Sequence, residues 1–143
     1  MSRIVPVPHT LEAAARAPIA AERLIRGRPL QAVENAYSTR DDRFHCGVWE
    51  GDVGAWRVHY TEHEFSHLPS GRVRLRSDDG EDIVLEAGQS FVVPAGFTGT
   101  WEVLETARKR ARGENTTEEA ASTKLFASEM LGRVADRAVQ IHG

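Results

Sequence analysis

The sequence predicts an all-β domain, a small antiparallel barrel or sandwich, and three observations point to that class. In residues 88–101 the apolar run Phe91, Val92, Val93 ends at Pro94, and a glycine-containing corner follows. Proline removes a backbone donor and ends a strand ladder, while glycine permits a tight reversal. Elsewhere, short apolar or alternating runs are separated by polar turns at roughly eight- to twelve-residue intervals, as in sandwiches and barrels. Finally, Asp-Gly at 79–80 lies between two apolar runs, a strong hairpin signal.

The bulk composition is that of an ordinary globular domain. The 143 residues include 41% hydrophobic and 27% charged residues, so one domain with a real core is expected. A net charge of −3 argues against nucleic acid or an anionic membrane as a partner. Cys46 is the single cysteine, which excludes an intramolecular disulfide and a cysteine-based zinc cage. With no apolar stretch typical of a signal peptide or membrane span, we predict a cytoplasmic protein.

The N-terminal part is weakly organised. Residues 10–17 have helix propensity, but Pro18 limits that helix to about two turns, so we interpret residues 1–18 as a frayed helix or a loose arm. Residues 22–29 are consistent with a helix that ends at Gly27 or with a short strand over residues 23–26, and the sequence leaves both open.

The middle of the chain predicts the strands of the barrel. Apolar side chains at Trp56, Val58 and Tyr60 alternate with Arg57 and His59, so the first three face a core and the other two face water. The same alternation exposes a row of arginines at residues 72–76, which acidic neighbours neutralise. The predicted strands are residues 44–50, 55–61, 65–68, 71–76, 82–85, 91–93 and 100–106.

After Lys109 the strand character is predicted to stop. Residues 110–115 resemble a polar linker, and Thr116 with Glu119 forms a capping-box pattern at the start of a helix. That amphipathic helix, residues 116–141, either covers the barrel or serves as a partner or dimerisation helix. The expected division is an arm at 1–18, a barrel at 19–109, a linker at 110–115 and the helix.

Two spaced motifs resemble those of the cupin superfamily. Gly51, Arg57, His59, Glu64 and Gly71 have the spacing of the first cupin motif. The local sequence is similar to the branch of small cupins named after (S)-ureidoglycine aminohydrolase. The resemblance covers residues 23–109 and implies a jelly-roll barrel, the double-stranded β-helix, that is often a homodimer. The second motif is matched by Gly88, Pro94, Gly96, Gly99 and Val103.

The resemblance implies a metal site that this sequence completes only in part. The cupin motifs place three histidines and a glutamate around a divalent ion, but Arg57 and Gly99 stand at the first and third histidine positions. His59 and Glu64 remain as metal-ligand candidates. One imidazole and one carboxylate are too few for a tight site. We therefore predict no cofactor, with Mn, Zn, Fe or Ni as the alternative, and note that Arg57 could hold a carboxylate instead.

Aromatic residues form the predicted ligand-binding wall, with a charged residue as its anchor. The candidate substrate-binding residues are Trp49, Trp56, Arg57, Tyr60, Glu64, Phe91 and Trp101, and Phe65 joins the same aromatic group.

Other histidines and the cysteine have plainer interpretations. His63 and His67 are expected at the surface rather than as ligands or general bases. Cys46, next to His45, is expected to be a buried structural cysteine rather than an activated thiolate.

Three functions follow from these features. The leading hypothesis is a small-molecule-binding cupin with a degenerate metal site. The second is a metal-dependent hydrolase of the (S)-ureidoglycine aminohydrolase type that acts on a small nitrogen-rich acid. The third is a structural or interaction module that uses the C-terminal helix. The sequence does not assign catalytic residues.

Overall fold

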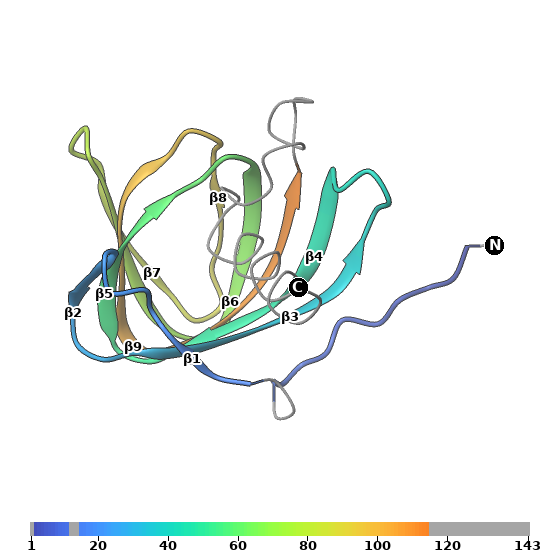
Figure 1. Cartoon of the computed structure of the whole chain (residues 1–143), viewed down its shortest axis with the longest axis horizontal. Helices are drawn as coiled ribbons and strands as arrows, with labels where there is room; N and C mark the ends of the chain where they lie inside the picture. The colour runs from blue at the N-terminus through green and yellow to red at the C-terminus, as the bar shows by residue number, and fades with distance from the viewer. Residues whose placement is uncertain (1, 12–14, 115–143) are drawn as a thin grey trace.

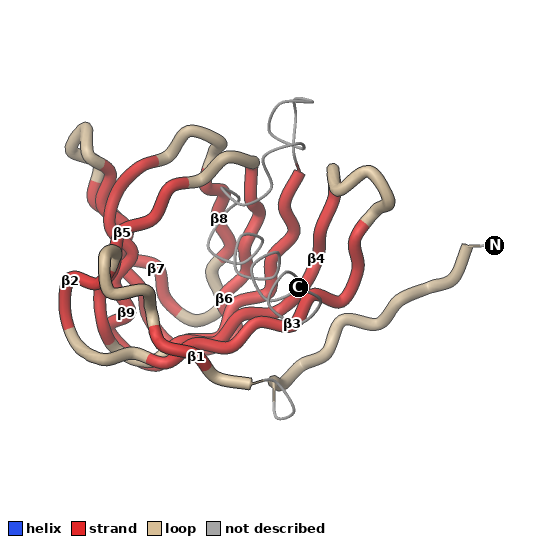
Figure 2. Tube along the Cα trace, viewed as in Figure 1, coloured by secondary structure: helices blue, strands red, loops and turns tan. Residues whose placement is uncertain are grey.

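The computed structural model describes residues 2–11 and 15–114, which form one curled antiparallel sheet around an apolar interior (Figure 1). These residues contain strands and loops and no helix (Figure 2). The strands are β1 (Ala17–Pro18), β2 (Leu24–Arg26), β3 (Leu30–Ser38), β4 (Phe44–Gly51), β5 (Gly54–His59), β6 (His63–Ser77), β7 (Asp82–Glu86), β8 (Ser90–Val93) and β9 (Thr98–Glu114).

Two long strands produce the curl. The first half of β9 pairs with β5 and its second half pairs with β4, while β6 runs antiparallel along both halves. The register of β6 on β9 shifts between His67 and Val73. Gly71 lies at this bend with φ of 91°, and a Cβ there would meet the Ala107 backbone at 2.4 Å. β7 and β8 pair with opposite halves of β6, which completes a half-barrel.

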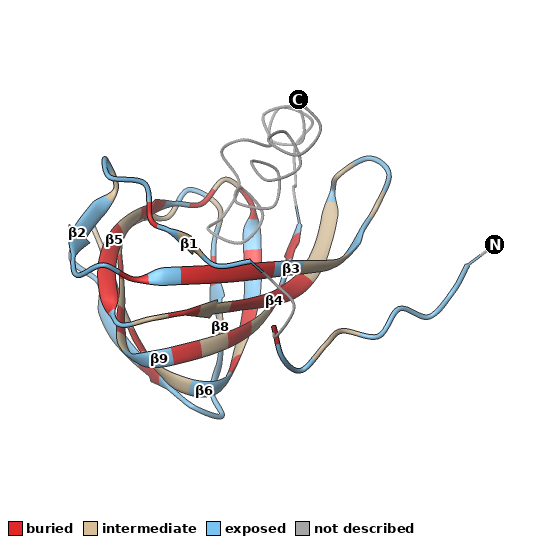
Figure 3. Ribbon diagram, turned by 60° about the horizontal axis from the view of Figure 1, so that its bottom comes forward, coloured by how far each residue is buried: buried red, intermediate tan, exposed pale blue. Residues whose placement is uncertain are grey.

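Strand alternation separates an inner face from an outer face (Figure 3). On β9 the odd-numbered residues other than Glu105 are buried, and Trp101, Val103 and Ala107 among them belong to the main core inside the half-barrel. On the outer face, a smaller cluster contains Ala32 and Val48 and is covered by Leu11 of the N-terminal arm.

Most predicted strands are confirmed. The Asp79–Gly80 hairpin joins β6 to β7, with Gly80 at φ of 106°. The strand alternative for residues 23–26 is correct, because β2 lies there and pairs with β5.

Four expectations need correction. The sequence did not predict β3, whose apolar and polar residues fall largely in pairs and do not alternate. Residues 69–71 form a bend within the single strand β6 rather than a turn. The described part of residues 10–17 is not helical, and Ala17 lies in β1. β9 continues past Lys109 to Glu114, because residues 110–114 pair with β4, so the strand does not stop where the linker was predicted.

The helix predicted at residues 116–141 lies outside the described residues, and the division of the chain into arm, barrel, linker and helix stays a prediction. Over residues 2–11 and 15–114, the fold offers no apolar helix of bilayer-spanning length.

Candidate functional site on the inner face

A buried ion pair lies on the inner face of the sheet. Lys109 Nζ donates a hydrogen bond to Glu64 Oε1 over 2.7 Å, and both side chains are completely buried. Ser66 Oγ donates to the same carboxylate oxygen over 3.0 Å. The pair forms because β6 and β9 are neighbours in the sheet and place their buried residues on one face. Burying two charges is costly, so the pair needs this close geometry.

Aromatic rings surround the ammonium group. Lys109 Nζ lies 4.8 Å from the ring centroid of Trp101 and 5.4 Å from that of Trp49. The two indoles meet edge to face, with centroids 5.5 Å apart. Trp49 Nε1 donates to Gln31 Oε1 over 2.8 Å, which ties β3 to the same group. Cation–π attraction is strongest where water is excluded, so this arrangement stabilises the ammonium inside the core.

The inner face also displays unused hydrogen-bonding capacity. Gln31 Nε2, Trp101 Nε1 and Glu64 Oε2 are buried and have no hydrogen-bond partner among the described residues. Leaving a buried polar atom unpaired costs about 1–3 kcal/mol. All three atoms belong to residues of this buried group: Glu64 is the partner of Lys109, the Trp101 ring lies against the ammonium, and Gln31 is bonded to Trp49.

Five of the seven predicted ligand-binding residues belong to one aromatic cluster. Trp49, Trp56, Tyr60 and Trp101 are fully buried in the main core, and the half-buried Phe91 packs against it. The Phe91 and Trp101 centroids are 6.3 Å apart. Glu64 joins this cluster through Lys109.

Arg57 does not belong to that cluster. Its side chain is 41% exposed, on the opposite face of β5 from Trp56, and its guanidinium donates two hydrogen bonds to Asp78, at 2.7 and 2.6 Å. This hydrogen bonding holds the pKa of the Asp78 carboxyl below its usual value. Phe65, which was grouped with the inner aromatics, is instead 40% exposed on the outer face.

The two candidate metal ligands are found in different surroundings. His59 is exposed, and its Nδ1 lies 2.9 Å from Thr98 Oγ1, as the alternation of β5 predicts. Glu64 faces an ammonium group at the distance of a direct ion pair. Within the described residues, no three His, Cys, Asp or Glu side chains gather as a metal-binding group. The residues present therefore do not fit the divalent ion that cupin motifs imply.

The remaining candidates, His63, His45 and Cys46, have surroundings that indicate a structural role. His63 is exposed and accepts a hydrogen bond from the Ala95 amide at its Nδ1, and His45 lies 2.8 Å from Ser38 Oγ. Cys46 is half-buried rather than buried, and burial raises the pKa of its thiol, which is opposite to thiolate activation.

Lys109 is the residue that sequence reasoning missed. It was placed at the end of the barrel, because residues 110–115 resembled a polar linker. A lysine is almost never fully buried unless it has a partner, and that partner, Glu64, is distant in the sequence. One signal could have found it: Trp101, Val103, Ala107, Lys109 and Ala111 all fall on odd positions of one strand. Gln31 was missed with the whole of β3.

Comparisons with known proteins agree with the fold. The family model of the EutQ-like cupin domain matches residues 38–111, just over half of the chain. A model of the acyl-CoA dehydrogenase C-terminal domain matches residues 101–143, which comprise residues 101–114 of β9 and residues beyond those described. No curated protein matches the chain.

Three solved structures resemble the chain in fold. A DUF861-family protein of unknown function from Pseudomonas syringae pv. tomato aligns over 72% of this chain with 21% identity and a TM-score of 0.64. The chain spans only 45% of that protein. The Clostridium difficile EutQ protein aligns over 61% of this chain and 69% of its own, with 17% identity and a TM-score of 0.55. KdgF from Halomonas sp. aligns over 62% of this chain and 83% of its own, with 13% identity and a TM-score of 0.51.

Proposed function

Because this chain belongs to the EutQ-like cupin domain family, we propose that it is a cupin that binds a small molecule against the inner face of its sheet. In this proposal the Lys109 ammonium takes the place of the metal ion beside Glu64. The supporting observation is the 2.7 Å contact between Lys109 Nζ and Glu64 Oε1, within a group of buried polar atoms.

The unpaired atoms define the ligand that would fit. Gln31 Nε2 and Trp101 Nε1 each need an acceptor, and Glu64 Oε2 needs a donor. The Lys109 charge is already balanced by Glu64, so the ligand needs no net charge of its own. A neutral molecule that carries both carbonyl or hydroxyl oxygens and an N–H or O–H group, such as a small amide or polyol, meets these requirements.

The hydrolase alternative has less support. A metal-dependent reaction of the (S)-ureidoglycine aminohydrolase type needs several histidines and carboxylates around one ion, and the inner face offers Lys109 and tryptophans beside Glu64 instead. Nothing in the described residues favours the interaction-module alternative either. A homodimer and a cytoplasmic setting stay predictions.

Thermal-shift screening tests the proposal. We expect at least one compound from a panel of small amides, diols and hydroxy amides to raise the Tm by several degrees at saturating concentration. Trp101→Phe keeps a ring and removes one donor, so it should weaken binding of that compound roughly tenfold. Trp56→Phe is the matched control, because it makes the same tryptophan-to-phenylalanine change elsewhere in the same core. This variant should keep the affinity within about threefold of wild type. The proposal fails if no panel compound binds, or if both variants lose affinity equally.

A further inference from the structure

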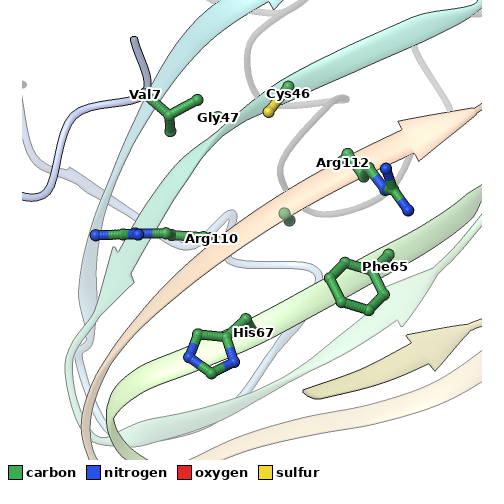
Figure 4. A pocket seen from close by; sticks show the side chains of 8 residues that line it. Val7, Cys46, Gly47, Phe65, His67, Arg110 and Arg112 are labelled. Atoms are coloured by element: carbon green, nitrogen blue, oxygen red, sulfur yellow. The ribbon is translucent and has the colours of Figure 1, made fainter. Parts of the chain in front are cut away.

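The outer face of the same sheet carries a hollow, which we call the outer groove. It has a volume of about 490 Å³, and Figure 4 shows six of its lining side chains. They come from the N-terminal arm, β4, β6 and β9, and are Val7, Cys46, Phe65, His67, Arg110 and Arg112. Gly47 and Ala111 also line the groove. Arg110 and Arg112 alternate along β9 with the buried Lys109, so the two arginine side chains lie on the opposite side of that strand from the inner-face ion pair.

The groove contains positive charge without a balancing carboxylate. No carboxylate oxygen lies within ion-pair distance of Arg110 or Arg112 among the described residues, whereas Arg108, one position away on β9, lies 3.5 Å from Glu50. Arg110 contacts His9 Nδ1, and its buried Nε has no hydrogen-bond partner within the described part of the chain. Guanidinium groups bind carboxylates and phosphates through paired hydrogen bonds, so two of them in one groove favour an anion.

An apolar surface borders this charge. The Phe65 ring is 40% exposed, and the Arg112 guanidinium carbon lies 5.2 Å from its centroid. Val92 is the strand partner of Phe65 and is 59% exposed, and Val7 lines the groove from the arm. A flat apolar ring can pack on Phe65 while its anionic substituent reaches the guanidinium groups.

His67 adds a further polar group. Its Nδ1 lies 2.9 Å from Ser90 Oγ, and the ring lines the groove on the β6 side (Figure 4). The groove volume falls in the range of small-molecule sites, and its mixture of an apolar wall with a few polar groups is typical of them.

We infer that the outer groove is a second binding site, for a small aromatic molecule that carries a phosphate or carboxylate group. The anion is held by Arg112, whose guanidinium lies against Phe65, and the ring of the ligand packs against Phe65. Arg110 points toward the N-terminal arm, where it contacts His9, and adds positive charge to the groove (Figure 4). The site is independent of the inner-face ligand, because its side chains lie on the other side of β9.

Calorimetric titration of the full chain tests this inference with phenyl phosphate and benzoate as probes. We expect at least one of them to bind, and inorganic phosphate and phenol each to bind at least about tenfold more weakly than that probe, because each supplies one half of the ligand. The stronger of the two probes identifies the anion. If neither binds at about 10 mM, the inference is wrong.

Variants locate the binding. Arg112→Gln should weaken the probe about tenfold or more, and Phe65→Leu should also weaken it, because leucine keeps apolar volume without a ring. Arg74→Gln removes one positive charge from an arginine paired with Asp82, outside the groove, and should leave the affinity within about twofold. Equal weakening by Arg74→Gln would indicate a general charge effect and overturn the inference.

Two further outcomes separate this site from its alternatives. Trp101→Phe should leave probe binding unchanged, and loss of binding there would place the probe on the inner face instead. Sedimentation should show the same oligomeric state for wild type and Arg112→Gln. A dimer that dissociates in that variant would make the groove a subunit interface and would overturn the small-molecule inference.

Discussion

Lys109 Nζ and Glu64 Oε1 lie 2.7 Å apart, and neither side chain reaches solvent. Their positions are 45 residues apart in the sequence, so the pair exists only once β6 and β9 are aligned. Such a pair does not have to increase the stability of a core, since well-packed apolar residues often do as well. Its location among unpaired polar atoms is the reason to assign it a role in binding.

Replacing one member of the Lys109–Glu64 pair should lower the free energy of unfolding far more than replacing both. We expect Lys109→Met to lower the free energy of unfolding by about 3–5 kcal/mol, because it leaves a buried carboxylate without its cation. The combined Lys109→Met, Glu64→Leu variant should recover most of that loss. Urea denaturation measures both values. A single variant within about 0.5 kcal/mol of wild type would show that the charges are not buried together.

The exposed pair of Arg57 and Asp78 gives a prediction for pH. Hydrogen bonds from Arg57 lower the pKa of Asp78, so its stabilising effect is present above the pKa of an unfolded aspartate, about 3.9, and is lost as the pH falls through the lower folded value. In Arg57→Gln the Asp78 pKa should rise toward that ordinary value, as measured by NMR of the carboxyl carbon. Asp82 is the internal control: Arg74 lowers its pKa in the same way, so it should titrate unchanged in this variant.

Gly96 and Gly99 follow β8 closely, and replacing each with alanine should destabilise the protein to a different extent. Steric contact at Gly99 should cost more stability than the backbone conformation at Gly96. A Cβ on Gly99 would lie 2.0 Å from the carbonyl oxygen of Arg76, whereas Gly96 has φ of 95° with open space around it. We expect Gly99→Ala to cost about 3 kcal/mol or more, since the strands must separate. Gly96→Ala should cost only about 1–2 kcal/mol, from the left-handed conformation alone. Thermal unfolding of the two variants would refute this order if Gly96→Ala were the less stable.

Treatment with a chelator should leave the thermal stability of the protein unchanged. Elemental analysis should find Mn, Zn, Fe and Ni well below one ion per chain, and a chelator should not alter the Tm, because Glu64 binds an ammonium group and His59 is exposed. His59→Ala should have no effect on either measurement. One ion per chain that is lost in His59→Ala would instead revive the cupin metal site.

Alternation in the sequence was enough to predict much of the barrel and its core. Trp56, Val58 and Tyr60 were assigned to the interior from their spacing alone, and all three are buried. β3 escaped prediction because it buries a polar residue, Gln31, whose amide accepts a hydrogen bond from Trp49. Such a partner is invisible before the strands are aligned, so the residue resembles one from a loop.

The end of β9 was missed for a related reason. Residues 110–115, with Arg110 and Arg112, resemble a polar linker, yet the residues from Ala107 to Glu114 are held by β4. Tertiary pairing overrides weak local propensity in such a strand. The candidate site was affected by the same error, because its central cation, Lys109, lies directly before the predicted linker and its counter-ion, Glu64, lies on β6.

The position of β9 in the sheet has a consequence for how the chain is made. β4, β5 and β6 all precede β9 in the sequence, and all three pair with it. During synthesis one edge of each strand therefore stays unpaired until residues 98–114 have left the ribosome. Phe44, for instance, pairs with Glu114, which lies 70 positions later in the sequence. Contacts this distant in sequence make folding slow, and the interval before closure is when neighbouring nascent chains can aggregate through those edges.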